Sequence, residues 1–170
     1  MKKVHRRSGK AGLPPGSLVH VSAGEHQASS LHLFRYDAAA VEERALQGLH
    51  ELPGATEEDR TTWLNIDGLH DDTVMRAAAE RFGLHPLLVE DILNTDHRPK
   101  LEEFEGGLFV VAKMLHLGKG NGRVQVEQVS FVLTKNMVVS LQERPGDVLE
   151  PVRARLREGL GRLRKAGADY

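Results

Sequence analysis

Residues 85–115 read HPLLVEDILNTDHRPKLEEFEGGLFVVAKML and contain the clearest change of pattern in the chain. Pro86 suits the first turn of a helix, where a backbone amide proton has no helical partner. Four apolar residues then recur at helical spacing: Leu87, Leu88, Ile92 and Leu93. A turn follows at 94–96, and from Lys100 the pattern becomes that of a strand ending in the apolar run Leu108–Val111. This stretch therefore predicts a short helix followed by a central strand.

Two adjacent carboxylates, Glu90 and Asp91, fall in the second half of the predicted helix. The helix dipole disfavours anions at that end, and the two charges repel each other, so a cation is expected to compensate them. One candidate is an ion pair with Arg98 or Lys100. The other is a divalent cation, since Mg²⁺ is commonly bound by one or two carboxylates together with its own water molecules. The residues alone leave both interpretations open.

The composition is that of an ordinary globular domain. The chain has 170 residues, of which 40% are hydrophobic and 28% are charged, enough for one domain with a sizeable core. A net charge of −1 gives no general electrostatic attraction to nucleic acid. The absence of cysteine excludes disulfides and thiolate metal sites. No run of 18 apolar residues occurs, so no membrane-spanning helix is predicted within this sequence.

The first part of the chain alternates between strand and helix signals. Residues 1–16 are polar, basic and rich in glycine and proline, which predicts a flexible tail. Strands are predicted at Ser17–Val21 and Leu31–Tyr36 from their alternating apolar residues. Asp37 is a suitable N-cap for a helix that we expect over Ala38–Leu49.

A strand and a helix are predicted next. The strand covers Thr62–Ile66 and contains the only tryptophan of the chain. The helix covers Thr73–Phe82, with Asp71 or Asp72 as its N-cap. Gly83 is expected to end this helix, because glycine readily adopts the left-handed conformation found after a last helical turn.

The C-terminal part predicts strands at Val124–Leu133 and Met137–Leu141 after a glycine-rich hairpin loop at 118–122. Consecutive strands joined by short turns are typical of an antiparallel meander. A last helix is predicted at Val148–Lys165, with an apolar stripe on one side and a basic opposite face. The basic residues are Arg153, Arg155, Arg157, Arg162, Arg164 and Lys165. We expect this face to be solvated, and the alternative is docking on acidic helices or phospholipid head groups.

Strands and helices in this order predict an α/β fold. We expect a mixed, partly antiparallel sheet of about six or seven strands, sandwiched between helices on both faces. Two of the helices would be inserted between the third and fourth strands. Residues 17–170 would form this single domain after the flexible tail at 1–16.

The quoted stretch also carries the motif HPL-x-x-EDIL-N-x-x-x-RPK, from His85 to Lys100. Further motif segments occur along the chain: Gly12–Gly16, Trp63–His70, Glu127–Asn136, Gly146–Val148 and Pro151–Arg155. Together they resemble the cytoplasmic N-terminal domain of CorA-type magnesium and cobalt transporters. The resemblance covers nearly the whole chain from about Gly12.

The resemblance implies part of an ion transporter and not an enzyme. In this family the domain continues into a long stalk helix that becomes the first transmembrane helix, and five subunits surround the ion path. The sequence contains neither the transmembrane helices nor the GMN signature of the pore mouth, so we expect it to be one domain of a longer protein. That domain would lie on the cytoplasmic side of the inner membrane, as part of a homopentamer.

The resemblance also implies a regulatory site for Mg²⁺, with Co²⁺ as a second candidate ion. In the family, Mg²⁺ bound at acidic sites between subunits favours the closed channel. The sensor carboxylate corresponds to Asp91, and Glu90 corresponds to a supporting acidic position. The acidic partner would come from the neighbouring subunit's stalk helix, beyond Tyr170, so each metal site would be half present in this chain.

Two alternatives to this function stay open in the sequence. A zinc-transporting member of the same superfamily would carry a similar domain. A free-standing soluble metal-dependent enzyme would need an acid/base or metal cluster made by His85, Glu90, Asp91 and His97. The sequence lacks phosphate-loop, nucleophile-elbow and HExxH motifs, so we expect no catalytic residue and no organic cofactor.

Overall fold

The computed structural model of the chain describes residues 28–53, 60–117 and 122–170. The tail predicted at 1–16 and the strand predicted at Ser17–Val21 lie outside these residues. Most of the loop predicted at 118–122 does so as well.

The described residues form one seven-stranded sheet, in the order β2-β1-β3-β7-β6-β5-β4. Its strands are β1 (Ser30–Tyr36), β2 (Val41–Leu46), β3 (Thr61–Asp67), β4 (Lys100–Phe104), β5 (Gly107–Leu117), β6 (Val124–Thr134) and β7 (Met137–Gln142). All neighbouring strands pair antiparallel except β3 and β7, which are parallel. The prediction of a mixed, partly antiparallel sheet of six or seven strands is confirmed.

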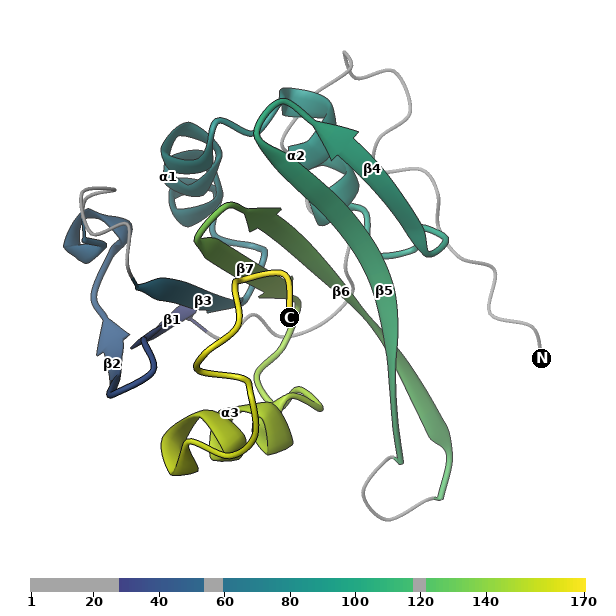
Figure 1. Cartoon of the computed structure of the whole chain (residues 1–170). Helices are drawn as coiled ribbons and strands as arrows, with labels where there is room; N and C mark the ends of the chain where they lie inside the picture. The colour runs from purple at the N-terminus through teal and green to yellow at the C-terminus, as the bar shows by residue number, and fades with distance from the viewer. Residues whose placement is uncertain (1–27, 54–59, 118–121) are drawn as a thin grey trace, which may run out of the picture.

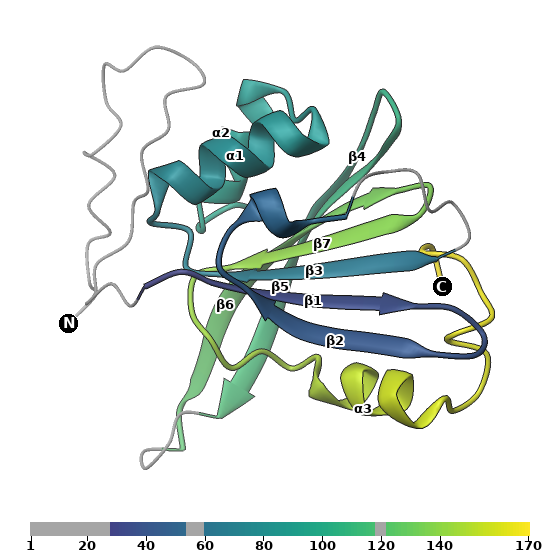
Figure 2. The same ribbon diagram turned by 90° about the vertical axis from the view of Figure 1, so that its left-hand side faces the viewer.

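Helices cover both faces of the sheet (Figures 1 and 2). The α-helices are α1 (Asp72–Phe82), α2 (Pro86–Leu93) and α3 (Glu150–Glu158), and a short 3₁₀-helix, η2 (Leu49–Glu51), follows β2. The first two lie side by side on one face and bury the larger core against it. Helix α3 lies on the opposite face, over a smaller cluster that contains Phe34, Tyr36, Trp63, Leu156 and Leu163. The predicted insertion of two helices between the third and fourth strands is also confirmed.

The segment after β1 differs from the prediction, because it forms strand β2 and not a helix. Asp37 closes the β1–β2 hairpin, where its Oδ1 accepts hydrogen bonds from the amides of Ala39 at 2.7 Å and Ala40 at 2.8 Å. An aspartate cap of a turn and an aspartate N-cap of a helix have the same sequence signature. Pairing with β1 along the whole of β2, together with burial of Leu46, outweighs the high helix propensity of the three alanines.

The strand predicted from Lys100 to Val111 is two strands joined by a tight turn. Gly106 occupies the turn with φ of 91°, a conformation that side-chain-bearing residues rarely adopt. At Gly107 a Cβ atom would lie 2.1 Å from the carbonyl oxygen of Leu133, so β6 leaves no room for a side chain there. The two glycines therefore turn the chain where the apolar pattern suggested continuity.

Helix α3 is shorter than the predicted Val148–Lys165. Gly159 ends it with φ of 67°, the left-handed conformation of a helix C-cap. The Arg164 side chain donates hydrogen bonds to two carbonyl oxygens of the last turn, which replace the bonds of a continuing helix. Residues 160–170 consequently run through turns.

Helix α1 follows the prediction closely. It begins after Asp71, whose Oδ1 accepts hydrogen bonds from the amides of Thr73 and Val74, and it ends at Gly83 in the left-handed conformation. We expect Asp71→Ala to reduce the free energy of unfolding by about 1 kcal/mol, because two amides of the first turn lose their acceptor.

Urea unfolding followed by circular dichroism measures this effect. The matched control is Asp72→Ala, since Asp72 is an exposed acid in the same turn, and its removal should cost no more than about 0.5 kcal/mol. Equal losses in the two variants would contradict the assignment of Asp71 as the cap.

Candidate functional site

Helix α2 fixes the position of Glu90 and Asp91. Pro86 occupies its first turn, and the amide of Leu87 donates to His85 Nδ1 at 3.2 Å, so His85 is the N-cap. The residues that pack into the core are Leu88, Val89, Ile92 and Leu93. Leu87, predicted to belong to this face, is half exposed, and Val89 is buried in its place. The buried face of α2 leaves both carboxylates at the edge of the helix.

The structure brings Asp91 together with two nitrogen-bearing side chains. Lys100 Nζ donates to Asp91 Oδ2 at 2.6 Å, and His97 Nε2 lies 2.7 Å from Asp91 Oδ1. The same ammonium donates to Glu102 Oε1 at 2.8 Å. Of the two expected ion-pair partners, the structure therefore shows Lys100 in contact with Asp91. The Asp91 side chain is 21% exposed, so part of it faces solvent.

Lys100 is held as a cation at this place. Partial burial lowers the pKa of its ammonium, but the hydrogen bonds to Asp91 and Glu102 outweigh that effect and raise the pKa above its usual value. The ammonium also lies 5.5 Å from the centre of the Phe109 ring. A cation over an aromatic face is attracted by the electron density of the ring.

Two residues that no sequence pattern indicated, Gln128 and Lys113, connect the end of α2 to the sheet. Gln128 Nε2 donates to the carbonyl oxygens of Asp91 at 3.3 Å and Asn94 at 3.2 Å. Lys113 Nζ donates to the Thr95 carbonyl oxygen at 2.8 Å and to Gln128 Oε1 at 3.1 Å. The bond to the Asp91 carbonyl oxygen satisfies a group that the helix end leaves without a helical partner, and the other bonds hold the turn that follows α2. No local pattern could reveal them, because Gln128 lies more than 30 residues from α2.

The residues present fit one side of a metal site and not a complete one. Asp91 supplies a carboxylate, the ligand type that Mg²⁺ prefers, and Glu90 is its neighbour in the chain. In the described part of the chain, no three or more His, Asp or Glu side chains gather closely enough to hold a metal ion. The cluster of His85, Glu90, Asp91 and His97 considered for an enzyme is therefore not assembled as a metal centre.

Comparison with known proteins decides the family. Residues 58–168 match the family described as CorA-like Mg²⁺ transporter protein. The chain belongs to this CorA-like family. It is 40% identical over 166 residues to the cobalt/magnesium transport protein CorA of Thermotoga maritima, an alignment covering 97% of this chain and 47% of that relative. This CorA-like chain thus spans about half the length of the curated relative that it matches.

The fold is shared with more distant solved structures. The full-length CmaX protein superposes with a TM-score of 0.62 at 17% identity, over 82% of this chain and 42% of that one. The soluble domain of CorA from Methanocaldococcus jannaschii superposes with a TM-score of 0.50 at 11% identity, over 72% of this chain and 44% of that one. At these identities the likeness shows the fold alone, and it confirms the predicted CorA-like sandwich. Within the described ranges, no helix is long and apolar enough to cross a membrane.

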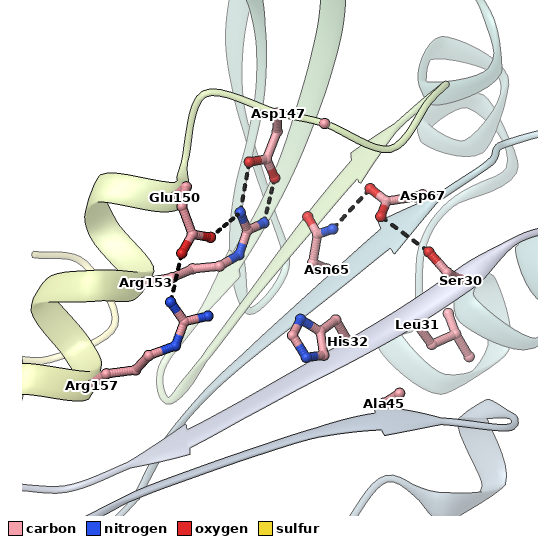
Figure 3. Close-up of a pocket in the computed structure, with 11 residues that line it drawn as sticks. Ser30, Leu31, His32, Ala45, Asn65, Asp67, Asp147, Glu150, Arg153 and Arg157 are labelled. Atoms are coloured by element: carbon pink, nitrogen blue, oxygen red, sulfur yellow. Dashed lines mark hydrogen bonds and ion pairs between the residues drawn. The ribbon is translucent and has the colours of Figure 1, made fainter.

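The CorA-like domain has a cleft on the sheet face opposite α2 (Figure 2). It has a volume of about 420 Å³ and lies between α3 and strands β1, β2 and β3 (Figure 3). Its charged lining residues are Asp67, Asp147, Glu150, Arg153 and Arg157. Arg157 is paired with Glu43 and Glu150 at 2.6 Å each, which ties α3 to the rim of the sheet.

The prediction of a solvated basic face on the last helix is wrong at Arg153. Its side chain is only 10% exposed, and both terminal nitrogens donate to the carboxylate of Asp147. The guanidinium lies 5.0 Å from the centre of the Trp63 ring. Burial raises the pKa of the Asp147 carboxyl, but the bonds from Arg153 and from the Leu149 amide lower it more, so its pKa lies below the usual value. This pair fixes α3 on the sheet.

We expect the Asp147–Arg153 pair to make stability depend on pH on the acid side. Because the pKa of Asp147 is depressed on folding, the stabilisation is complete above the unfolded-state value of 3.8 and is lost as pH falls through the folded-state value. At neutral pH, Asp147→Asn should reduce the free energy of unfolding by roughly 3 kcal/mol, since it removes the buried partner of the Arg153 guanidinium.

Urea unfolding of the wild type and of Asp147→Asn, at neutral pH and near pH 3, measures the difference in their free energies of unfolding. This difference should shrink in acid. Glu150→Gln is the control, because Glu150 belongs to the same cleft but its side chain is 62% exposed. A stability difference for Asp147→Asn that stayed constant with pH would show that the pair has no such role.

Proposed function

We propose that this chain is the cytoplasmic, divalent-cation-sensing domain of a CorA-type Mg²⁺/Co²⁺ transporter. Family membership and the 40% identity to a cobalt/magnesium transport protein support this assignment. Because the chain spans about half of that relative, the pore would belong to the remaining half of a similar protein. The domain would work on the cytoplasmic side of the inner membrane, in a homopentamer.

The environment of Asp91 is the observation that carries the sensing role. This carboxylate lies near the C-terminal end of α2, where the dipole disfavours a negative charge. Lys100 provides compensating positive charge at 2.6 Å. Each carboxylate oxygen has two lone pairs, so the contacts to Lys100 and His97 leave further acceptor positions. Asp91 is thus a partly exposed anion in a place that favours cation binding.

The mechanism that we propose is a shift between two arrangements of the subunits. Bound Mg²⁺ supplies positive charge between the acidic side chains of neighbouring copies, which would otherwise repel each other. Asp91 contributes one carboxylate from this chain, and Glu90 adds negative charge beside it. A ligand shifts such an equilibrium only through its differential affinity for the two states. Mg²⁺ would favour the closed channel because only that arrangement brings the carboxylates of two subunits together.

Limited proteolysis of the full-length protein at increasing MgCl₂ concentration tests the role of Asp91. In the wild type, Mg²⁺ should protect the protein, because it holds the subunits together. Asp91→Asn should raise the MgCl₂ concentration for half-protection by roughly tenfold or more, since loss of a charged ligand removes at least about 1.4 kcal/mol of binding free energy.

Asp96→Asn is the matched control, because Asp96 is an exposed acid in the loop that follows α2. Asp96→Asn should keep the MgCl₂ concentration for half-protection within about twofold of the wild-type value, because Asp96 would make no contact with the metal and its charge is screened by salt. Identical curves for the wild type and Asp91→Asn would refute the assignment. A parallel titration with ZnCl₂ distinguishes the zinc-transporting alternative, in which Zn²⁺ would protect at the lower concentration.

A further inference from the structure

We propose that Lys100 is a built-in competitor for the metal, whose ammonium occupies the Asp91 carboxylate when no divalent cation is bound. This inference rests on the proposed function, since it assumes that Asp91 is a metal ligand. It adds a property that depends only on residues within this chain: Lys100 sets the metal concentration at which the site fills.

At Asp91 Oδ2 the lysine ammonium and a divalent cation would repel each other. Lys100 Nζ lies 2.6 Å from this oxygen, and a magnesium–oxygen bond is about 2.1 Å long. A divalent ion on the same oxygen would therefore come within a few ångströms of the ammonium. The Lys100 and Asp91 side chains are only 24% and 21% exposed, so water screens this repulsion incompletely. We therefore expect metal binding to displace the ammonium from Asp91.

Glu102 provides the place to which the ammonium can withdraw. Its Oε1 already accepts a hydrogen bond from Lys100 Nζ at 2.8 Å, so the lysine is shared between two carboxylates. Lys100 and Glu102 are two positions apart on β4 and project from the same face of the strand. When the metal takes Asp91, Lys100 keeps one charged partner. Displacement is consequently a change of partner and not the loss of one.

Both competing groups are fixed by elements of the fold. Lys100 begins β4, where it pairs with Val111 of β5, and its ammonium lies over the ring of the fully buried Phe109. The end of α2 is fixed by the bonds from Gln128 to the carbonyl oxygens of Asp91 and Asn94. A competitor attached in this way has a high and constant effective concentration. It raises the metal concentration needed for half-occupancy without blocking the site.

A positioning role for Lys100 predicts the opposite result, which makes the inference testable. If Lys100 only orients Asp91 for the metal, removal of its charge should weaken metal binding. If Lys100 competes with the metal, removal of its charge should strengthen binding. Glu102 adds an independent variant, because the loss of the alternative partner should keep the ammonium on Asp91 and weaken metal binding.

The experiment uses the full-length protein, with MgCl₂ as the probe and half-protection from proteolysis as the readout. Isothermal titration calorimetry with MgCl₂ gives a second measure of the same affinity. Lys100→Met should lower the half-protection concentration roughly five- to thirty-fold, the effect of losing one partly buried charge pair. Glu102→Gln should raise it by roughly threefold, because an exposed charge contributes less. Lys100→Arg keeps the charge and should remain within about threefold of the wild type.

The outcomes separate this inference from the proposed function. If Asp91→Asn leaves the curve unchanged, the sensor assignment itself fails. If Asp91→Asn weakens protection but Lys100→Met leaves it unchanged or weakens it too, only the competitor role is overturned. The gain from Lys100→Met should also vanish in the double variant with Asp91→Asn. Should Lys100→Met fail to fold, a decrease or no change in half-protection concentration for Glu102→Gln overturns the inference by itself.

Discussion

The parallel pairing of β3 with β7 joins the two antiparallel halves of this domain, and the position of every other element depends on it. One half consists of β2, β1 and β3, and the other of β7, β6, β5 and β4. A buried chain of hydrogen bonds crosses the joint, in which Trp63 Nε1 donates to Ser140 Oγ at 2.9 Å and Ser140 Oγ donates to Asn65 Oδ1 at 2.6 Å. A buried polar group that loses its partner costs about 1–3 kcal/mol, so this chain of bonds also favours the observed strand register.

The same joint places the candidate metal ligand. Parallel strands need a crossover, and α1 and α2 form part of the connection that leaves β3 and returns through β4, β5 and β6 to β7. In this connection the apolar side of α2 packs into the core, and Asp91 lies at the edge of the helix, in contact with Lys100 of β4. The fold therefore brings the Asp91 carboxylate and the Lys100 ammonium together. On the opposite face, Arg153 and Asp147 hold α3 over Trp63 by the same combination of charge and aromatic contact.

The elements that the sequence predicts correctly are those whose local signals agree with the tertiary structure. The cap and stop of α1 and the proline at the start of α2 are local, and the structure has them as predicted. The helix expected at Ala38–Leu49 was wrong because strand pairing with β1 is a long-range interaction that helix propensity does not contain. The burial of Arg153 was missed for the same reason, since its partner Asp147 looked like a simple helix cap. At the site, a cation beside the carboxylate was predictable from an unfavourable helix position, but the sequence left Arg98, Lys100 and a metal ion as alternatives. Gln128 reaches α2 only through folding.

The central claim is that Asp91 binds a divalent cation in competition with Lys100. A crystal structure of the full-length protein grown with CoCl₂, with data collected at the cobalt absorption edge, tests it most directly. The account predicts an anomalous peak about 2.1 Å from an Asp91 carboxylate oxygen. It also predicts that the Lys100 ammonium has left Asp91 and remains bonded to Glu102. Cobalt bound elsewhere in the cytoplasmic part of the protein, with Lys100 still on Asp91, would contradict the account.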